Sequence, residues 1–222
     1  MSESEHTLLV QLTDALTVAF RDAVLLAYRN HSKEHFYAFI LFTSPSFDYA
    51  ALAFNTEEAL RQIGPTCDQS NALRWNPPDW KYNWEGDEFF SHVNTLIGSL
   101  QTVHDRGEYD WRKTRTVFFN TLKCLDNEGL FATANDRAQV LINVMWGDQN
   151  ILEHIPSAKV LNPTSSYIAY ARHKLPSLYA TEKEFERGRS MYKDEALAHI
   201  RRVIAEVEED LKITPRSGGL WN

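Results

Sequence analysis

One five-residue stretch of the sequence matches the spacing of a metal-dependent hydrolase. His31, Glu34 and His35 reproduce the pattern His-x-x-Glu-His, in which both histidines bind zinc and the glutamate acts as a base. For this chemistry the pattern must lie within a helix. Here it joins the end of an expected helix to the start of an expected buried strand, so we expect the two imidazoles to point apart. We interpret the stretch as a solvated polar connector and predict no metal site.

Other common catalytic motifs are missing from the sequence. There is no Gly-x-Ser-x-Gly elbow, no Gly-x-x-x-x-Gly-Lys phosphate loop and no Gly-x-Gly-x-x-Gly dinucleotide fingerprint. The remaining histidines are scattered singly, and a lone histidine is usually a surface residue or a satisfied core residue. We therefore predict no cofactor, and the leading hypothesis below has no catalytic residue.

Four carboxylates support the alternative hypothesis, which is an enzyme. Asp48, Glu57, Glu58 and Asp79 lie near one another in the expected topology, and two carboxylates across a cleft can act as acid and base. Structural roles explain them equally well, because Asp48 suits a hairpin turn, the glutamates suit a helix N-terminus and Asp79 suits a turn cap. The alternative is a small enzyme of unknown reaction with a carboxylate site near Asp48, Glu57 and Asp79.

A tryptophan-rich corner is the most specialised stretch of the chain. Trp75, Trp80 and Trp84 fall within eleven residues, together with the adjoining Pro77 and Pro78. The prolines fix φ at about −65° and push the preceding residues out of the α region, so an extended run must turn sharply here. Such a corner can close one edge of the core or present rigid rings to a partner. We expect Trp75 to be core at the end of a strand, and Trp80 or Trp84 to be partly exposed.

Hydrophobic periodicity predicts helices around a few short strands. We expect helices over residues 8–28, 57–63, 87–105, 109–125 and 181–211, and strands over 36–43, 49–54, 72–75 and 138–146. Thr181 and Glu184 form a capping box that indicates the start of the last helix. Pro156 leaves 151–161 ambiguous, and 167–173 is interpreted as a short separate segment. Together these elements predict an α+β fold, with a small, mostly antiparallel sheet covered by several helices.

The length and composition of the chain fit a single domain over residues 1–222, with 214–222 as a frayed tail. Cys67 and Cys124 lie far apart in the sequence without a metal-binding neighbour, so we expect free thiols. The acidic start is unlike a secretory leader, and the longest apolar run is far shorter than the ~20 residues of a membrane-spanning helix. We expect a cytoplasmic protein that does not enter membranes. A net charge of −7 and a pI near 5.6 disfavour nucleic acid and favour a basic protein as the partner.

Four local patterns together resemble one known family. They are Phe36-Tyr37-Ala38-Phe39, Asn55-Thr56-Glu57-Glu58, Arg74-Trp75-x-Pro-x-Asp79-Trp80-x-Tyr82 and Ser157-Ala158-x-x-Leu161-Asn162-Pro163. The chain is similar to the bacterial domain-of-unknown-function family numbered 4303, from about the first helix to Pro163. Proteins of this kind resemble the small acidic cytosolic immunity proteins that accompany bacterial toxins. The resemblance therefore implies a non-enzymatic protein that binds and neutralises a toxin domain.

This protein-binding function is the leading hypothesis, and its candidate residues lie in and beside the tryptophan corner. The partner-binding candidates are Asp48, Glu57, Asp79, Trp80 and Trp84. Exposed aromatic rings would supply contact area, and the acidic charge would attract a basic toxin domain.

We expect the purified protein to contain no stoichiometric metal, because no set of ligands in the sequence has workable spacing. Elemental analysis checks this expectation. A content of about one zinc per chain, lost in a His31→Ala or His35→Ala variant, would contradict it.

Overall fold

The fold is built around a small sheet of four strands. The computed structural model describes residues 3–63, 73–103, 110–132, 136–146, 151–187 and 193–213. The strands are β1 (Phe36–Thr43), β2 (Ala51–Thr56), β3 (Tyr82–Asn83) and β4 (Leu141–Trp146), in the spatial order β3-β2-β1-β4. The pairs β1–β2 and β2–β3 are antiparallel, whereas β4 lies parallel to β1. The expected α+β class with a mostly antiparallel sheet is confirmed.

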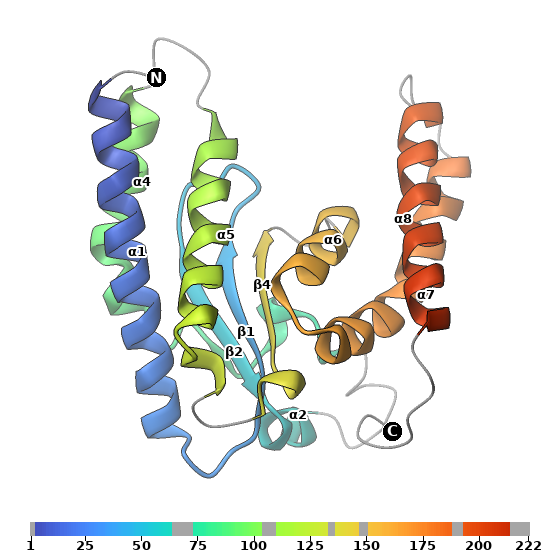
Figure 1. Cartoon of the computed structure of the whole chain (residues 1–222), viewed down its shortest axis with the longest axis horizontal. Helices are drawn as coiled ribbons and strands as arrows, with labels where there is room; N and C mark the ends of the chain where they lie inside the picture. The colour runs from blue at the N-terminus through green and yellow to red at the C-terminus, as the bar shows by residue number, and fades with distance from the viewer. Residues whose placement is uncertain are drawn as a thin grey trace.

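Helices cover both faces of this sheet (Figure 1). One face carries α1 (Glu3–Asn30), α4 (Ser91–Val103) and α5 (Trp111–Asn127), and the other carries α6 (Ile151–Leu161) and α7 (Thr164–Arg187). The last helix, α8 (Lys193–Ile213), packs along α7 beside the sheet. The shorter elements are α2 (Glu57–Ile63) and the 3-10 helices η1 (Pro77–Asp79), η2 (Asp87–Phe90), η3 (Leu130–Ala132) and η4 (Arg137–Gln139). Within the described ranges, no helix combines the length and the apolar character that crossing a membrane requires.

The central strand β1 is buried on both faces, so its side chains divide between two cores. Phe39 and Leu41 enter the first core, which lies under α1, α4 and α5. Ile40 and Phe42 enter the second core, which lies under α6, α7 and α8. This division follows from the period of two in a strand, which sends successive side chains to opposite faces. The strand and hairpin expected from the aromatic, apolar run at 36–43 are confirmed.

The prediction of a strand over residues 72–75 is wrong. Residue 72 lies outside the described residues, Leu73 is helical, and Arg74 and Trp75 form a turn before η1. The amide of Asn76 donates to the carbonyl of Leu73 at 3.2 Å, which closes this turn. The short strand β3 takes the place at the edge of the sheet instead, because the chain must complete the corner before it can pair with β2.

The expected start of the last helix at Thr181 is also wrong. Thr181 lies inside α7, where its hydroxyl donates to the carbonyl of Ser177 at 2.9 Å rather than capping a helix. The helix α7 continues through Pro176, whose missing amide and displaced carbonyl are tolerated because this residue is exposed. The segment 167–173 is therefore part of a long helix, and α8 begins only at Lys193.

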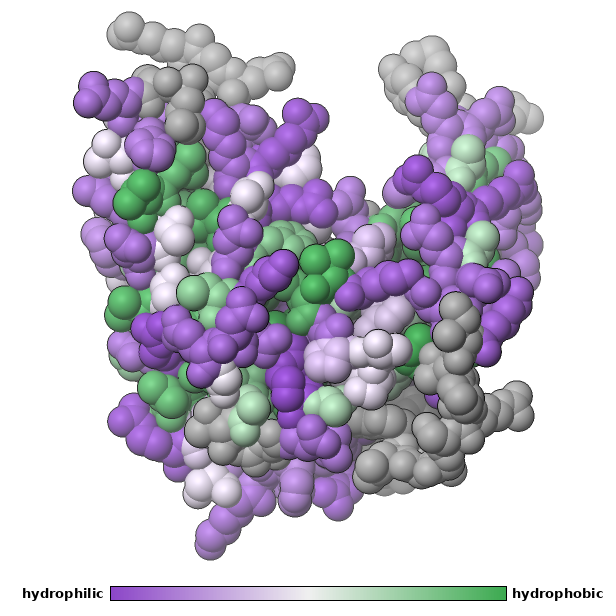
Figure 2. Space-filling view, in the orientation of Figure 1, coloured by the Kyte–Doolittle hydropathy of each residue, from purple (hydrophilic) through white to green (hydrophobic). Residues whose placement is uncertain are grey.

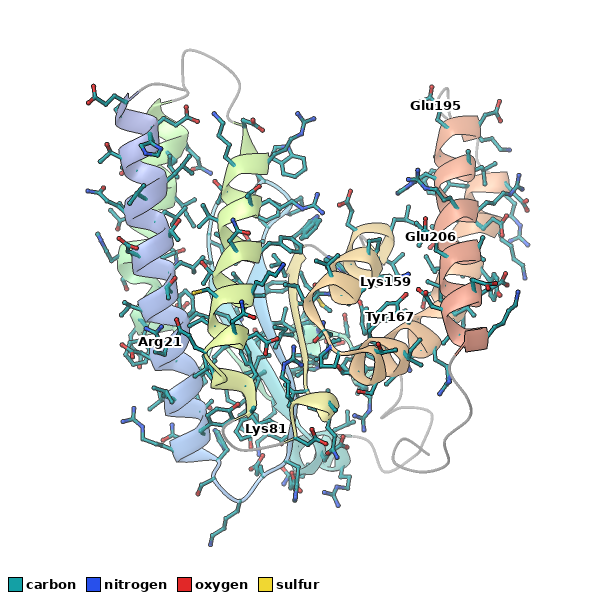
Figure 3. All side chains as sticks on the ribbon, viewed as in Figure 1. Arg21, Lys81, Lys159, Tyr167, Glu195 and Glu206 are labelled. Carbon is teal, nitrogen blue, oxygen red and sulfur yellow. The ribbon has the colours of Figure 1, made fainter. Side chains whose placement is uncertain are left out.

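A charged contact anchors the α7–α8 hairpin to α6. Asp210 of α8 accepts hydrogen bonds from Lys159 Nζ at 2.6 Å and from the Tyr167 hydroxyl at 2.7 Å. Figure 3 shows Lys159 and Tyr167 in the space between α6 and α8. In the space-filling view the molecule is hollowed between the α5 side and the α8 side (Figure 2). The hairpin thus stands beside the sheet and is held at its base by these three side chains.

Two expectations concern the cysteines and the C-terminal tail. Cys124 is an exposed free thiol, as expected. Cys67 and the frayed tail expected over 214–222 lie outside the described residues.

The strand β4 lies at the edge of the sheet, and side chains satisfy its outer backbone groups. Unpaired N–H groups of an edge strand must find acceptors when they are buried. Asn162 acts as a substitute strand, because its Oδ1 accepts from the Ile142 amide and its Nδ2 donates to the Ile142 carbonyl, both at 2.7 Å. The Trp146 amide donates to His154 Nε2 at 3.2 Å. These contacts hold α6 against the edge of the sheet.

The contact with Trp146 requires a neutral imidazole on His154. Because Nε2 accepts the hydrogen bond, the ring proton lies on Nδ1. Burial, followed by the nearby charges of Lys174 and Arg115, lowers the pKa of His154 from 6.5 to about 3. Between these two pH values the unfolded chain binds a proton that the folded protein excludes. The associated stability is present above pH 6.5 and is lost as the pH falls toward 3.

We therefore expect wild-type protein to lose stability more steeply than a His154→Gln variant on acidification. Glutamine offers an oxygen acceptor to Trp146 but does not titrate. At about 1.4 kcal/mol per pH unit, lowering the pH by roughly two units below 6.5 should cost the wild type about 2–3 kcal/mol that the variant retains. Urea unfolding across this range measures the difference, with the exposed His92→Gln as the control. Parallel pH profiles for wild type and His154→Gln would contradict this account.

Candidate functional site

The tryptophan corner packs around one buried side chain, Tyr37 of β1. The rings of Trp75 and Trp80 meet the Tyr37 ring edge-on, at centroid distances of 5.4 and 5.9 Å. The Tyr37 hydroxyl donates to the carbonyl of Arg74 and accepts from Asn55 Nδ2, both at 2.9 Å. Trp75 and Trp80 are each only 4% exposed. These two rings therefore close the edge of the second core, and Trp75 is core as expected although it follows a turn.

Of the two tryptophans considered for the surface, Trp80 is buried and Trp84 is exposed. The reason lies in the 3-10 helix η1, where three residues per turn place positions i and i+3 on the same side. Pro77 and Trp80 consequently face the core, whereas Pro78 and Asp79 face solvent. The Trp80 indole N–H also finds a backbone acceptor at 3.0 Å. The charged residues next to Trp80 in the sequence therefore reach water while the Trp80 ring stays buried.

Trp84 combines exposure with an unusual backbone conformation. Its side chain is 45% exposed, and its φ of 72° lies in the left-handed region that bulky residues rarely occupy. The ring lies edge-on to Phe42 at 6.3 Å and is tilted against Tyr49 at 5.8 Å. Asp48, which precedes Tyr49, is also exposed. We name Trp84, Tyr49 and Asp48 together the Trp84 patch.

The residues of the His-x-x-Glu-His pattern make separate structural contacts. His31 Nε2 lies 2.9 Å from a carboxylate oxygen of Glu85, and Glu34 accepts from the Tyr82 hydroxyl at 2.8 Å. His35 is exposed and lies 2.9 Å from a glutamate at the start of α2. The two imidazoles thus have different partners. Across the described residues, no group of three potential metal ligands occurs.

The structure does not gather the candidate carboxylates into one site. Asp48 lies before β2 and Glu57 directly after it, so the six residues of this strand separate them by roughly 20 Å. Glu57 is held by Arg74, whose two terminal nitrogens each lie 2.7 Å from a carboxylate oxygen. Asp79 is exposed and accepts from Asn76 Nδ2 at 2.5 Å. The expectation that these groups lie near one another is therefore wrong for Asp48 and Glu57.

A cavity of about 350 Å³ lies behind the tryptophan corner. The corner, β1, β4, α6 and α7 all contribute to its wall. Its lining includes Phe42, Trp75, Met145, His154, Tyr170 and Lys174, together with polar side chains of α7. Phe42 also contacts Trp84, so the cavity adjoins the Trp84 patch. The exposed patch and the adjoining, partly open cavity together form the candidate functional site.

Lys174 is a candidate functional residue that sequence reasoning missed. Tyr167, Tyr170, Lys174 and Leu178 recur at helical spacing along α7, and this face packs into the second core. A lysine within an otherwise apolar stripe is the signal that could have identified it. Interpreting 167–173 as a short separate segment hid this stripe, because Lys174 then lay outside any helix.

We expect Trp80→Ala to lower the free energy of unfolding by about 3–5 kcal/mol, because it empties a buried aromatic site. Trp84→Ala should cost much less, since that ring already contacts solvent. Urea unfolding at fixed pH compares the two variants, with Trp75→Ala as the buried reference. A smaller loss for Trp80→Ala than for Trp84→Ala would contradict the observed packing of the corner.

Comparison with known proteins identifies one family to which the chain is related. Searches of curated proteins and of solved structures each found no match. Residues 16–163 match the family described as Domain of unknown function (DUF4303), which is more than half of the 222 residues. The match stops just before α7, so the α7–α8 hairpin lies beyond it. The resemblance noted in the sequence is confirmed, and the chain belongs to the DUF4303 family.

Proposed function

We propose that this protein is a non-enzymatic binding protein that recognises a protein partner through the Trp84 patch. The observation that carries the proposal is Trp84, a half-exposed tryptophan in a left-handed backbone conformation. Tryptophan is the residue type most enriched among the hot spots of protein interfaces. Its two aromatic neighbours, Phe42 and Tyr49, hold the ring in place before a partner arrives.

The backbone of Trp84 supports a role beyond folding. A left-handed conformation costs a residue with a β-carbon about 1–2 kcal/mol, and such strain concentrates at functional sites. Burying the Trp84 ring against the fold offsets this conformational cost only in part, because Trp84 stays 45% exposed. Contact with a partner would bury the remainder of the ring and recover apolar stabilisation.

The charge of the chain supports a basic partner. The net charge is −7, and exposed Asp48 lies within the Trp84 patch while exposed Asp79 lies on η1. An acidic surface attracts a basic protein and accelerates its association. A cytoplasmic immunity protein that binds and neutralises a basic bacterial toxin domain fits this description and the family resemblance.

The geometry narrows the candidate binding residues. Trp80 is removed from them because its ring is buried, and Glu57 is removed because Arg74 occupies both of its carboxylate oxygens. Trp84, Asp48 and Asp79 stay as candidates because they are exposed. The carboxylate enzyme receives no support, since Asp48 and Glu57 lie at opposite ends of β2.

We expect a Trp84→Gly variant to fold normally and to lose partner binding. Glycine accepts the φ of 72° without strain, so this change removes the ring and leaves the turn intact. Truncating a hot-spot tryptophan costs about 2 kcal/mol or more, which is roughly a 30-fold rise in the dissociation constant. A partner is first captured from the native host at low salt and identified, and its affinity is then measured by calorimetry with purified proteins.

Phe185→Ala is the matched control, because Phe185 is a 39% exposed aromatic residue on α7, away from the patch. It should bind like the wild type. Asp48→Asn should slow association with a basic partner and reduce the dependence of binding on salt. Equal affinities of wild type and Trp84→Gly for the captured protein would refute the proposed surface.

A further inference from the structure

The wall of the cavity behind the tryptophan corner combines apolar side chains with polar and charged ones. Phe42, Trp75, Met145 and Ile151 supply apolar and aromatic surface. Lys174 reaches the cavity from the buried stripe of α7. A volume of about 350 Å³ is at the lower end of the range typical of small-ligand sites, about 300–1,000 Å³. The space therefore suits a small molecule rather than a peptide segment.

The ammonium group of Lys174 has no carboxylate partner among the described residues. Burial is the cause that lowers its pKa, with no opposing contribution from an acidic neighbour. The one carboxylate in the lining belongs to Glu184, which is exposed and forms no ion pair with Lys174. The Nζ atom of Lys174 lies 6.0 Å from the centroid of the Tyr170 ring. A buried charge without a partner is costly to the fold.

Two further groups in the cavity wall can donate hydrogen bonds. The Tyr170 hydroxyl is fully buried and has no hydrogen-bond partner in the described structure. Burial raises the pKa of Tyr170, so this hydroxyl stays protonated at neutral pH. His154 uses Nε2 as an acceptor for the Trp146 amide, which leaves the proton on Nδ1. The lining thus combines a positive charge with one unpaired hydroxyl donor.

We propose that this cavity binds a small organic anion, whose carboxylate or phosphate meets Lys174 and whose apolar body lies against Trp75 and Phe42. The anion would supply the missing countercharge for Lys174 and an acceptor for Tyr170. Its body would be flat and apolar, because the facing wall consists of aromatic rings and aliphatic side chains. This site is independent of partner binding at the Trp84 patch, since it is tested with small molecules and variants that leave the patch unchanged.

The test uses phenylacetate as the anionic probe and phenylacetamide as its neutral match. Isothermal calorimetry with the full chain should show saturable binding of phenylacetate, and at least roughly tenfold weaker binding of phenylacetamide. Lys174→Met keeps the length and apolar stem of the side chain and removes its charge, so it should weaken phenylacetate binding by a similar factor. Lys183→Met, an exposed lysine on the same helix, should bind like the wild type.

A second variant covers the case in which Lys174→Met fails to fold. Tyr170→Phe removes only the unpaired hydroxyl, which the fold does not use, and should weaken phenylacetate binding several-fold without loss of thermal stability. The affinities for phenyl phosphate and N-acetylphenylalanine then show which acidic group the site prefers. Tighter phenyl phosphate binding assigns a phosphorylated ligand, and tighter N-acetylphenylalanine binding assigns a small carboxylate.

Three results would overturn the proposal. The first is an absence of saturable binding for all three anions with wild-type protein. The second is equal binding of phenylacetate and phenylacetamide, because charge would then play no part. The third is unchanged phenylacetate affinity in both folded Lys174→Met and Tyr170→Phe, which would place any binding elsewhere on the molecule.

Discussion

The unpaired backbone groups along the outer edge of β4 impose the constraint on which the second half of the structure depends. A buried N–H without an acceptor is costly, so the strand edge must be covered. Asn162 and His154 cover it and thereby fix the two ends of α6 against the sheet. From this fixed position the chain enters α7, which carries Tyr170 into the second core and Lys174 to the wall of the cavity. Burial at this contact lowers the pKa of His154 and keeps its ring neutral, so Lys174 is the one cation lining the cavity among the described residues.

Elements with a regular apolar period were predictable, because their burial follows directly from side-chain spacing. The hairpin of β1 and β2, the helix α1 and the helix α5 were expected from such spacing alone, within a few residues of their bounds. The elements that were missed depend on context. Trp80 is buried because η1 turns every three residues, a period that flanking charges do not reveal. The helix α7 passes through Pro176 because that position faces solvent, a fact known only once the helix is packed.

The family match covers only part of the candidate site. Residues 16–163 include Phe42, Trp75 and His154, which form the apolar and structural side of the cavity. Tyr170 and Lys174 lie on α7, beyond the match. The matched region could therefore build the corner and the sheet without the charged wall. A family resemblance alone does not predict the cavity chemistry, because the residues that determine its charge belong to the α7–α8 hairpin.

Two residues at the candidate site conflict with the local preferences that otherwise explain the fold. Trp84 holds a bulky side chain in a left-handed backbone conformation, and Lys174 holds a charge in a mostly apolar stripe. A sequence selected for stability alone would place glycine at the first position and an apolar residue at the second. Phe42 lies between the two positions, because it contacts Trp84 on one side and lines the cavity of Lys174 on the other. Since local strain and unpaired charge concentrate where proteins bind their ligands, their proximity is the reason that we propose this region as the binding face of the molecule.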